Sequence, residues 1–257
     1  MLQELERAAH GHLGVAALDS RAEGTVLYRA DERFPMCSTA KLMIVGAILR
    51  QDMDSDGSLS RRIEYGEKDL VPYSPVTEKQ VAHGMVVAQL CAAALQYSDN
   101  TAANLLLRLL GGPQAVTAFA RSIGDETFRL DRWEPELNSA LPGDERDTTS
   151  PMAMAHSLRK LLLGDALTPT RRAQLHAWMR GNTTGDKRIR AGVPPGWDVA
   201  DKTGTGAYGT CNDVGILWPP YRVPIMLAVY FTCPDPERAT NDAIIAEVTR
   251  HIAQMFG

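Results

Sequence analysis

The sequence predicts an α/β fold of the α+β type: a discontinuous domain with a five-stranded antiparallel sheet flanked by helices, plus an inserted all-α domain. Strand-like runs occur only near the two ends of the chain, and a helical stretch from about Thr39 to Arg180 separates them. With 257 residues, 44% hydrophobic and 23% charged, the chain can bury a substantial core. We expect an α/β domain of residues 1–34 and 181–257, a helical domain of residues 35–180, and a site at their junction.

Five runs rich in apolar and β-branched residues predict the strands. The first two are His12–Asp19 and Thr25–Arg29, which a short turn containing Gly24 joins. The other three are separated by Gly or Pro-Pro, and they are Val199–Thr205, Thr210–Trp218 and Val223–Thr232.

The helical stretch opens with Thr39–Arg50, a mostly apolar run that predicts a buried helix. The last helix, Asn241–Phe256, has its apolar residues at the spacing of a face that packs on a sheet. The helices predicted between them are Val81–Leu95, Thr101–Leu110, Pro113–Ile123, Pro151–Leu162 and Pro169–Met179.

Charge and hydropathy exclude several classes of partner. The net charge of −4 provides no basic surface for nucleic acid or an anionic membrane. Apolar runs stay shorter than a membrane span, and Met1–His10 lacks the apolar core of a signal peptide. We therefore expect no binding to nucleic acid or membrane, and either a cytosolic protein or a mature form with an added start methionine.

Cysteine and histidine positions argue against a metal site. The four cysteines are widely scattered without a Cys-x-x-Cys spacing, and the six histidines lie outside every motif described below. We expect no metal and no cofactor. The cysteines are Cys37, Cys91, Cys211 and Cys233.

A serine and a lysine one helical turn apart, Ser38 and Lys41, begin the buried helix. A serine there can be a simple N-cap, but the same place offers backbone N–H donors and the positive end of the helix dipole. Lys41 lies on the same helical face, within reach of a hydroxyl that must lose its proton to act as a nucleophile. A second Ser-x-x-Lys, Ser157–Lys160, lies inside a helical run, and we interpret it as solvated helix surface.

Three companion motifs follow in order: Ser98-Asp99-Asn100, Glu134-Pro135-Glu136-Leu137-Asn138 and Lys202-Thr203-Gly204. They add a second hydroxyl, a carboxylate and another lysine, which suits acyl transfer through a serine ester followed by hydrolysis of that ester. Alone, the Ser98 motif would indicate a helix N-cap. In order and spacing the four motifs resemble those of the class A serine β-lactamases, and the resemblance covers nearly the whole chain.

The resemblance implies a β-lactam hydrolase that confers antibiotic resistance, and it implies a role for each motif. Lys41 would activate Ser38 either as a neutral base or as a cation, and Glu134 would activate the water that attacks the ester. The implied catalytic residues are Ser38, Lys41, Ser98, Glu134 and Lys202. The implied substrate-binding residues are Tyr73, Asn100, Asn138, Thr203, Gly204 and Thr205, with Gly204 letting substrate lie against the strand edge. The backbone N–H groups of Ser38 and Thr205 would form the oxyanion hole.

Two departures from the commonest family pattern affect these expectations. Many relatives have an arginine for the substrate carboxylate where this chain has Cys211, and others supply it from an earlier segment. Arg188 matches that segment, with Arg190 as a close competitor, so we assign Arg188 to substrate binding. Many relatives also have a disulfide at the position of Cys91, but Val45 replaces its partner. We expect Cys91 to be a free, buried thiol and Cys37 to be a packing residue.

The family also implies a long Ω-like loop around Glu134, closed by a pair between Arg132 and Asp147, and a cis bond before Pro135. It implies a periplasmic or secreted mature protein, a monomer, with a small β-lactam as its partner. The alternatives are a penicillin-binding transpeptidase or carboxypeptidase, and a receptor that is acylated once as a signal. Glu134 with Asn138 argues against both, because they supply a base for deacylation.

Overall fold

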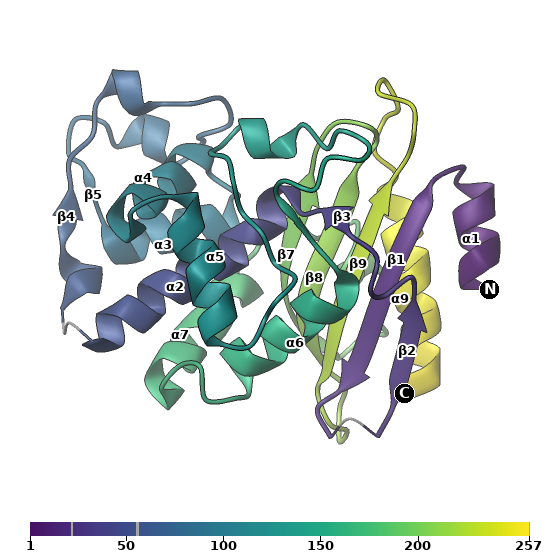
Figure 1. The fold of residues 1–257 in the computed structure, drawn as a ribbon. Coiled ribbons are helices and arrows are strands. Elements are labelled where there is room, and N and C mark those ends of the chain that lie inside the picture. The colour runs from purple at the N-terminus through teal and green to yellow at the C-terminus, as the bar shows by residue number, and fades with distance from the viewer. Residues whose placement is uncertain (22, 55–56, 257) are drawn as a thin grey trace.

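The computed structural model describes residues 1–257 except residues 22, 55–56 and 257. At its centre is a five-stranded antiparallel sheet of order β2-β1-β9-β8-β7 (Figure 1). The predicted sheet is confirmed, and the predicted strand ends lie within two residues of the observed ones. The strands are β1 (His12–Asp19), β2 (Thr25–Tyr28), β7 (Asp198–Thr205), β8 (Cys211–Trp218) and β9 (Ile225–Thr232).

The predicted helices are also observed, with one late start and two additions, the short helices Leu2–Ala8 and Ile189–Gly192. The predicted Val81–Leu95 begins only at Val87, because Met85–Val86 (β5) pairs with Arg62–Ile63 (β4). An unpredicted short helix, α1 (Leu2–Ala8), precedes the sheet. The others are α2 (Ala40–Asp54), α3 (Val87–Gln96), α4 (Asn100–Leu110), α5 (Pro113–Ser122), α6 (Pro151–Leu162), α7 (Pro169–Arg180), α8 (Ile189–Gly192) and α9 (Asp242–Phe256).

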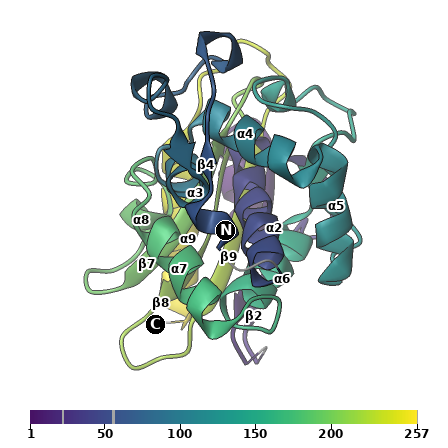
Figure 2. The ribbon, with the colours of Figure 1, turned by 90° about the vertical axis from the view of Figure 1, so that its left-hand side faces the viewer.

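Different layers cover the two faces of the sheet. Helix α9 covers one face, where Ile245 and Val248 join strand residues such as Val229 in a buried cluster. Helix α6 lies on the opposite face, and α2, α4 and α7 extend the structure on that side (Figure 2). None of the described helices is long and apolar enough to cross a membrane.

We propose the division into residues 1–34 with 181–257 and residues 35–180 as a description of the path of the chain. The strands β1, β2 and β7–β9 come from the first part, and α2–α7 come from the second. One apolar cluster nevertheless runs from Ala228 and Tyr230 of the sheet to Leu42 and Leu106 of the helices. The two parts therefore share a core, and the junction between them is closely packed.

All four cysteines are free and buried in the structure. The expectation of a free, buried Cys91 is confirmed. Cys37 is fully buried, and burial raises the pKa of its thiol. A buried neutral thiol acts as a small apolar side chain, which agrees with a packing role.

Candidate active site

The Ser38 segment is a 3₁₀ turn, Cys37–Thr39 (η1), that leads into α2. Cys37 has a positive φ of 48°, and Asn212 of β8 donates hydrogen bonds to the carbonyls of Pro35 (2.8 Å) and Met36 (3.1 Å). Strand β8 thereby fixes the backbone just before Ser38. Sequence reasoning did not identify Asn212, because its partners are about 177 residues away along the chain.

Lys41 is buried at the centre of the site. Its Nζ lies 2.8 Å from Ser38 Oγ, 2.7 Å from the Ser98 carbonyl and 2.6 Å from Asn100 Oδ1. Nζ also forms an ion pair with Glu134 Oε1 at 2.9 Å. Burial lowers the pKa of Lys41, and the nearby Glu134 carboxylate partly opposes that shift.

Lys202 is the second buried amine, and it lies on the other side of Ser98. Its Nζ donates to Ser98 Oγ at 3.0 Å, and Lys41 Nζ reaches the same oxygen at 3.3 Å. Burial is the largest cause, and the positive charge of Lys41 the second, that lowers the pKa of Lys202 well below its ordinary value. The Ser98 hydroxyl thus lies between two amines that can hold or pass a proton.

Glu134 reaches the nucleophile from the loop between α5 and α6. Ser38 Oγ donates to Glu134 Oε1 at 3.3 Å, and the Asn138 side-chain amide donates to Oε2. The Glu134–Pro135 peptide bond is cis, as the resemblance implied. Asn138 Oδ1 is buried without a hydrogen-bond partner among the described residues, which leaves an acceptor open beside Glu134.

A residue that sequence reasoning missed, Asn104 of α4, holds the Glu134 backbone. Asn104 Oδ1 accepts from the Glu134 N–H at 2.9 Å, and its Nδ2 donates to the Glu134 carbonyl at 2.9 Å. The two bonds imitate one rung of a β-ladder between a helix side chain and a loop. In the sequence nothing distinguishes Asn104 from the other polar residues of its helical run, Thr101 and Arg108.

The neck of the Glu134 loop closes as the resemblance implied. Arg132 Nε donates to Asp147 Oδ2 at 2.5 Å. Asp147 Oδ1 also accepts from the backbone N–H groups of Asp131 (2.8 Å) and Arg132 (2.9 Å). Asp147 is 1% exposed, so this carboxylate is a buried, fully hydrogen-bonded anchor for the loop.

A cavity of about 380 Å³ opens above Ser38 and brings together most of the predicted substrate-binding residues. Tyr73 stands at its edge with 61% of its surface exposed, as expected of an aromatic side chain at a cleft mouth. Thr184, which no motif contained, is also part of the wall. The lining residues are Ser38, Tyr73, Ser98, Asn100, Asn138, Thr184, Arg188, Thr203 and Thr205.

Gly204 has a different reason to be glycine than the sequence suggested. A Cβ atom there would lie 2.6 Å from the Met36 carbonyl oxygen and 3.1 Å from Thr39. This close approach is a reason for glycine that the sequence did not suggest, and the expected contact of Gly204 with substrate stays a prediction. Its missing side chain lets β7 approach the Ser38 turn, since a Cβ in that space would push the two apart.

Arg188, and not Arg190, reaches the cavity. Its guanidinium donates to the carbonyls of Gly204 (2.7 Å) and Asn212 (2.8 Å), to Asp242 (2.8 Å) and to the Thr205 hydroxyl (2.8 Å). These contacts use four of its five N–H donors within the described structure, which leaves one hydrogen on Nη2 for a ligand. Arg190 instead pairs with the buried Asp201 at 2.7 Å.

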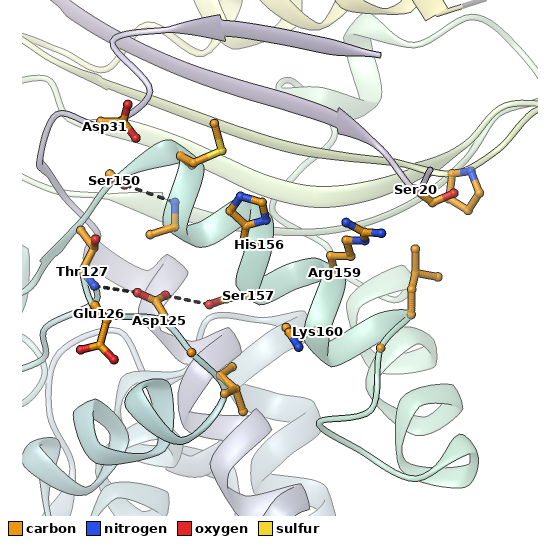
Figure 3. Close-up of a pocket in the computed structure, with 17 residues that line it drawn as sticks. Ser20, Asp31, Asp125, Glu126, Thr127, Ser150, His156, Ser157, Arg159 and Lys160 are labelled. Carbon is orange, nitrogen blue, oxygen red and sulfur yellow. Dashed lines mark hydrogen bonds between the residues drawn. The ribbon is translucent and has the colours of Figure 1, made fainter. Parts of the chain in front are cut away.

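A larger cavity, of about 970 Å³, lies away from these residues along α6 (Figure 3). It contains the second Ser-x-x-Lys. Ser157 points at Asp125 and donates to it at 2.7 Å, whereas Lys160 is exposed. Our interpretation of this motif as solvated surface is wrong for Ser157, which is 2% exposed. A serine that donates its proton to a structural carboxylate, with no buried amine beside it, is not an activated nucleophile.

Within the described residues, no group of three or more His, Cys, Asp or Glu side chains is arranged to hold a metal ion. The amines, hydroxyls and single carboxylate around Ser38 are instead proton donors and acceptors. This donor set suits acid–base and nucleophilic chemistry.

Comparison with known proteins agrees with this geometry. Residues 1–256 match the model of the beta-lactamase enzyme family. The chain is 52% identical to β-lactamase OXY-2 of Klebsiella oxytoca over 253 residues, 98% of this chain and 87% of that protein. It is 52% identical to β-lactamase Toho-1 of Escherichia coli over 255 residues, 99% of this chain and 88% of that one.

Solved structures give the same result. A β-lactamase from Desulfarculus baarsii superposes with a TM-score of 0.98 at 54% identity, covering 100% of this chain and 96% of that one. A mutant of the last common ancestor of Gram-negative bacteria β-lactamase, class A, superposes with a TM-score of 0.96 at 58% identity, covering 99% and 97%. With the four motifs gathered around one cavity, the chain belongs to the class A β-lactamases, enzymes that hydrolyse β-lactams and confer resistance to them.

Proposed function

We propose that Ser38 opens the β-lactam ring to form an acyl-enzyme, and that a water activated by Glu134 then hydrolyses the ester. The observation that carries this proposal is the position of Ser38 Oγ, 2.8 Å from Lys41 Nζ and 3.3 Å from Glu134 Oε1. A nucleophile with an amine and a carboxylate in hydrogen-bond reach has the groups needed for both half-reactions.

In the first half-reaction, the Ser38 oxygen bonds to the lactam carbonyl carbon, and the carbon–nitrogen bond of the ring breaks. Glu134 contacts Ser38 Oγ and can receive its proton directly. Lys41 can receive it when its amine is neutral, a state that its burial favours, and as a cation it donates to Ser38 Oγ and eases the loss of the proton. The lactam nitrogen must gain a proton as it leaves. Ser98 suits this step, because its hydroxyl lines the cavity and can be resupplied by either buried amine.

The tetrahedral intermediate needs donors for its oxyanion. Strand β7 is at the edge of the sheet, and the Gly206 N–H donates to the Thr210 carbonyl at 3.1 Å. Successive N–H groups alternate in an antiparallel strand, so the Thr205 N–H points to the open side of β7. The Ser38 N–H begins a helical turn, where N–H groups have no partner within the helix. These two groups form the proposed oxyanion hole.

The second half-reaction requires a water held against the ester. The Glu134 carboxylate and the open Asn138 Oδ1 converge beside Ser38, and together they can accept both protons of one water. General-base assistance of this kind is typically worth about 10²- to 10⁴-fold in rate. It separates a hydrolase from a penicillin-binding protein or a receptor, in which the acyl group stays on the serine.

The cavity wall supplies the proposed substrate contacts. Arg188 provides positive charge, and Thr203 and Thr205 provide hydroxyls, for the carboxylate of a β-lactam. Lys202 is buried beside Ser98, outside the lining residues, and adds its charge when its amine is protonated. Asn100 Nδ2 donates to the Pro72 carbonyl at 2.9 Å and keeps a second hydrogen for a substrate amide. The exposed Tyr73 ring can cover the bound molecule.

We also propose that the enzyme works as a periplasmic or secreted monomer. The four motifs of one chain complete the site around Ser38, so the proposed chemistry requires no residue from a second subunit. Such an enzyme meets its substrate outside the cytoplasm and needs only the β-lactam and water.

The test is a paired assay with benzylpenicillin, in which absorbance follows turnover and intact-protein mass follows the adduct. The native protein should turn over many times with little adduct, and Glu134→Ala should accumulate a stable acyl adduct. Glu136→Ala is the matched control, because Glu136 is an exposed carboxylate two residues away. A stoichiometric adduct on the native protein would overturn the role of Glu134, and neither adduct nor turnover would overturn the proposed function.

A further inference from the structure

A chain of polar groups outside the motifs leads from a buried acid to the cavity. Asn182 Nδ2 donates to Asp201 Oδ2 at 2.6 Å, and Asn182 Oδ1 accepts from Thr184 Oγ1 at 2.8 Å. Thr184 Oγ1 in turn lies 2.5 Å from Thr203 Oγ1. Thr184 and Thr203 both line the cavity, so the chain ends where the substrate carboxylate would bind.

The donor and acceptor of each hydrogen bond in this series follow from Asp201, the buried acid at its end. Asp201 is fully buried and pairs with Arg190 at 2.7 Å, so its carboxylate acts as an acceptor. Asn182 must therefore turn its NH₂ group to Asp201 and its oxygen to Thr184. That oxygen also accepts from the Thr184 backbone N–H at 3.0 Å, which confirms the orientation.

A hydroxyl has one proton to donate. Because the Thr184 proton is directed at Asn182, the Thr203 hydroxyl must donate in its contact with Thr184. Without substrate, Thr203 thus presents lone pairs to the cavity, and a carboxylate would be repelled by them. To bind a carboxylate, Thr203 has to rotate its proton outward, and Thr184 then has to donate to Thr203.

We infer that Thr184 is a positioning residue for the substrate carboxylate, acting by this paired rotation of two hydroxyls. The inference rests on the proposed function, since it concerns the carboxylate of the same substrate. When Thr184 turns to Thr203, Asn182 Oδ1 keeps the Thr184 N–H as a donor, so the rotation leaves no buried acceptor empty. No proton changes its parent oxygen.

The backbone at Gly185 lies close to Asp201 and Asn182, the first two groups of this hydrogen-bonded series. A Cβ atom on Gly185 would lie 2.0 Å from Asp201 Oδ2 and 2.9 Å from Asn182 Nδ2. Only a glycine lets the loop approach the acid this closely, which fixes Thr184 next to Thr203.

The test compares benzylpenicillin with its methyl ester, which lacks the negative charge that Thr203 would meet. Thr184→Val removes the hydroxyl at nearly constant volume. Valine cannot donate to the Thr203 oxygen once the Thr203 proton has turned to the carboxylate. The substitution should therefore lower kcat/KM for the acid about tenfold, mainly through KM, and leave kcat/KM for the ester unchanged. Thr184→Ser should restore the native value. Thr183→Val is the matched control, because the Thr183 hydroxyl donates to the Gln96 carbonyl, away from the cavity.

Two results would overturn the inference: equal loss for acid and ester, or no loss for the acid. If Thr184→Val does not fold, kcat/KM for the acid and the ester is compared in Thr184→Ala and Thr184→Ser instead. In a double-mutant cycle, Thr184→Val should cost little once Thr203→Val is present, and additive losses would contradict action through Thr203. Failure of the proposed function is distinct, because the native protein itself would then not hydrolyse benzylpenicillin.

Discussion

Asn104→Ala tests whether the Glu134 backbone must be held from α4. The substitution removes both hydrogen bonds between Asn104 and Glu134, each 2.9 Å long, and leaves a buried N–H and a buried carbonyl without partners. An unsatisfied buried backbone group costs about 1–3 kcal/mol, so the free energy of unfolding should fall by roughly 2–6 kcal/mol. Near the middle of that range, Tm falls by roughly 10 °C for a chain of this size.

The functional consequence should be larger for deacylation than for acylation. Ser38 stays fixed by η1 and β8, whereas Glu134 loses its tie to the helix. A displacement of about 1 Å in a catalytic group can cost about 10²-fold in rate. We therefore expect an acyl adduct on Asn104→Ala during turnover of benzylpenicillin.

The assay combines thermal unfolding with rapid-quench mass spectrometry of the adduct. Gln114→Ala on α5 is the control, since it removes an exposed side-chain amide. Combined with Glu134→Ala, the Asn104 substitution should slow deacylation no further. Native-like stability together with an unchanged adduct level in Asn104→Ala would refute the reasoning.

Three further predictions concern the loop, the carboxylate site and pH. Asp147→Ala opens the neck of the loop, so deacylation should slow more than acylation in single-turnover measurements; unchanged deacylation would contradict this. Arg188→Ala should raise KM for penicillins about tenfold, whereas Arg180→Ala, an exposed arginine, should not; an unaltered KM in Arg188→Ala would remove it from the substrate site. Burial is the largest cause, and the negative charge of Asp201 the second, that raises the pKa of Asp213 well above its ordinary value. The unfolded chain therefore loses the Asp213 proton at a lower pH than the folded protein does. As pH rises above the pKa of an aspartate in the unfolded chain, the free energy of unfolding should decrease. Urea titrations of Asp213→Asn from about pH 5 to about pH 8 should show a smaller decrease, and equal slopes would refute the assignment.

Local pattern was sufficient for most of the fold. Strand β1 and helix α6 begin and end at the predicted residues, because alternation, apolar spacing and a proline at the first helical turn are all local signals. The late start of α3 was not predictable in this way. Gly84, with a φ of 62°, and the pairing of β5 with β4 end the helical pattern, and both depend on a partner strand about twenty residues earlier.

The sequence by itself determined the four motifs, and with them the family and the kind of chemistry. It did so because each motif is a short run whose residue types and order carry the signal. Tertiary structure alone decided that Asn104 holds Glu134, that Thr184 meets Thr203, and that Gly204 serves the Ser38 turn. It likewise buried Ser157, which the helical pattern had put at the surface. These outcomes depend on contacts between distant segments, and such contacts form only when the core packs and sets the spacing between helix, loop and strand.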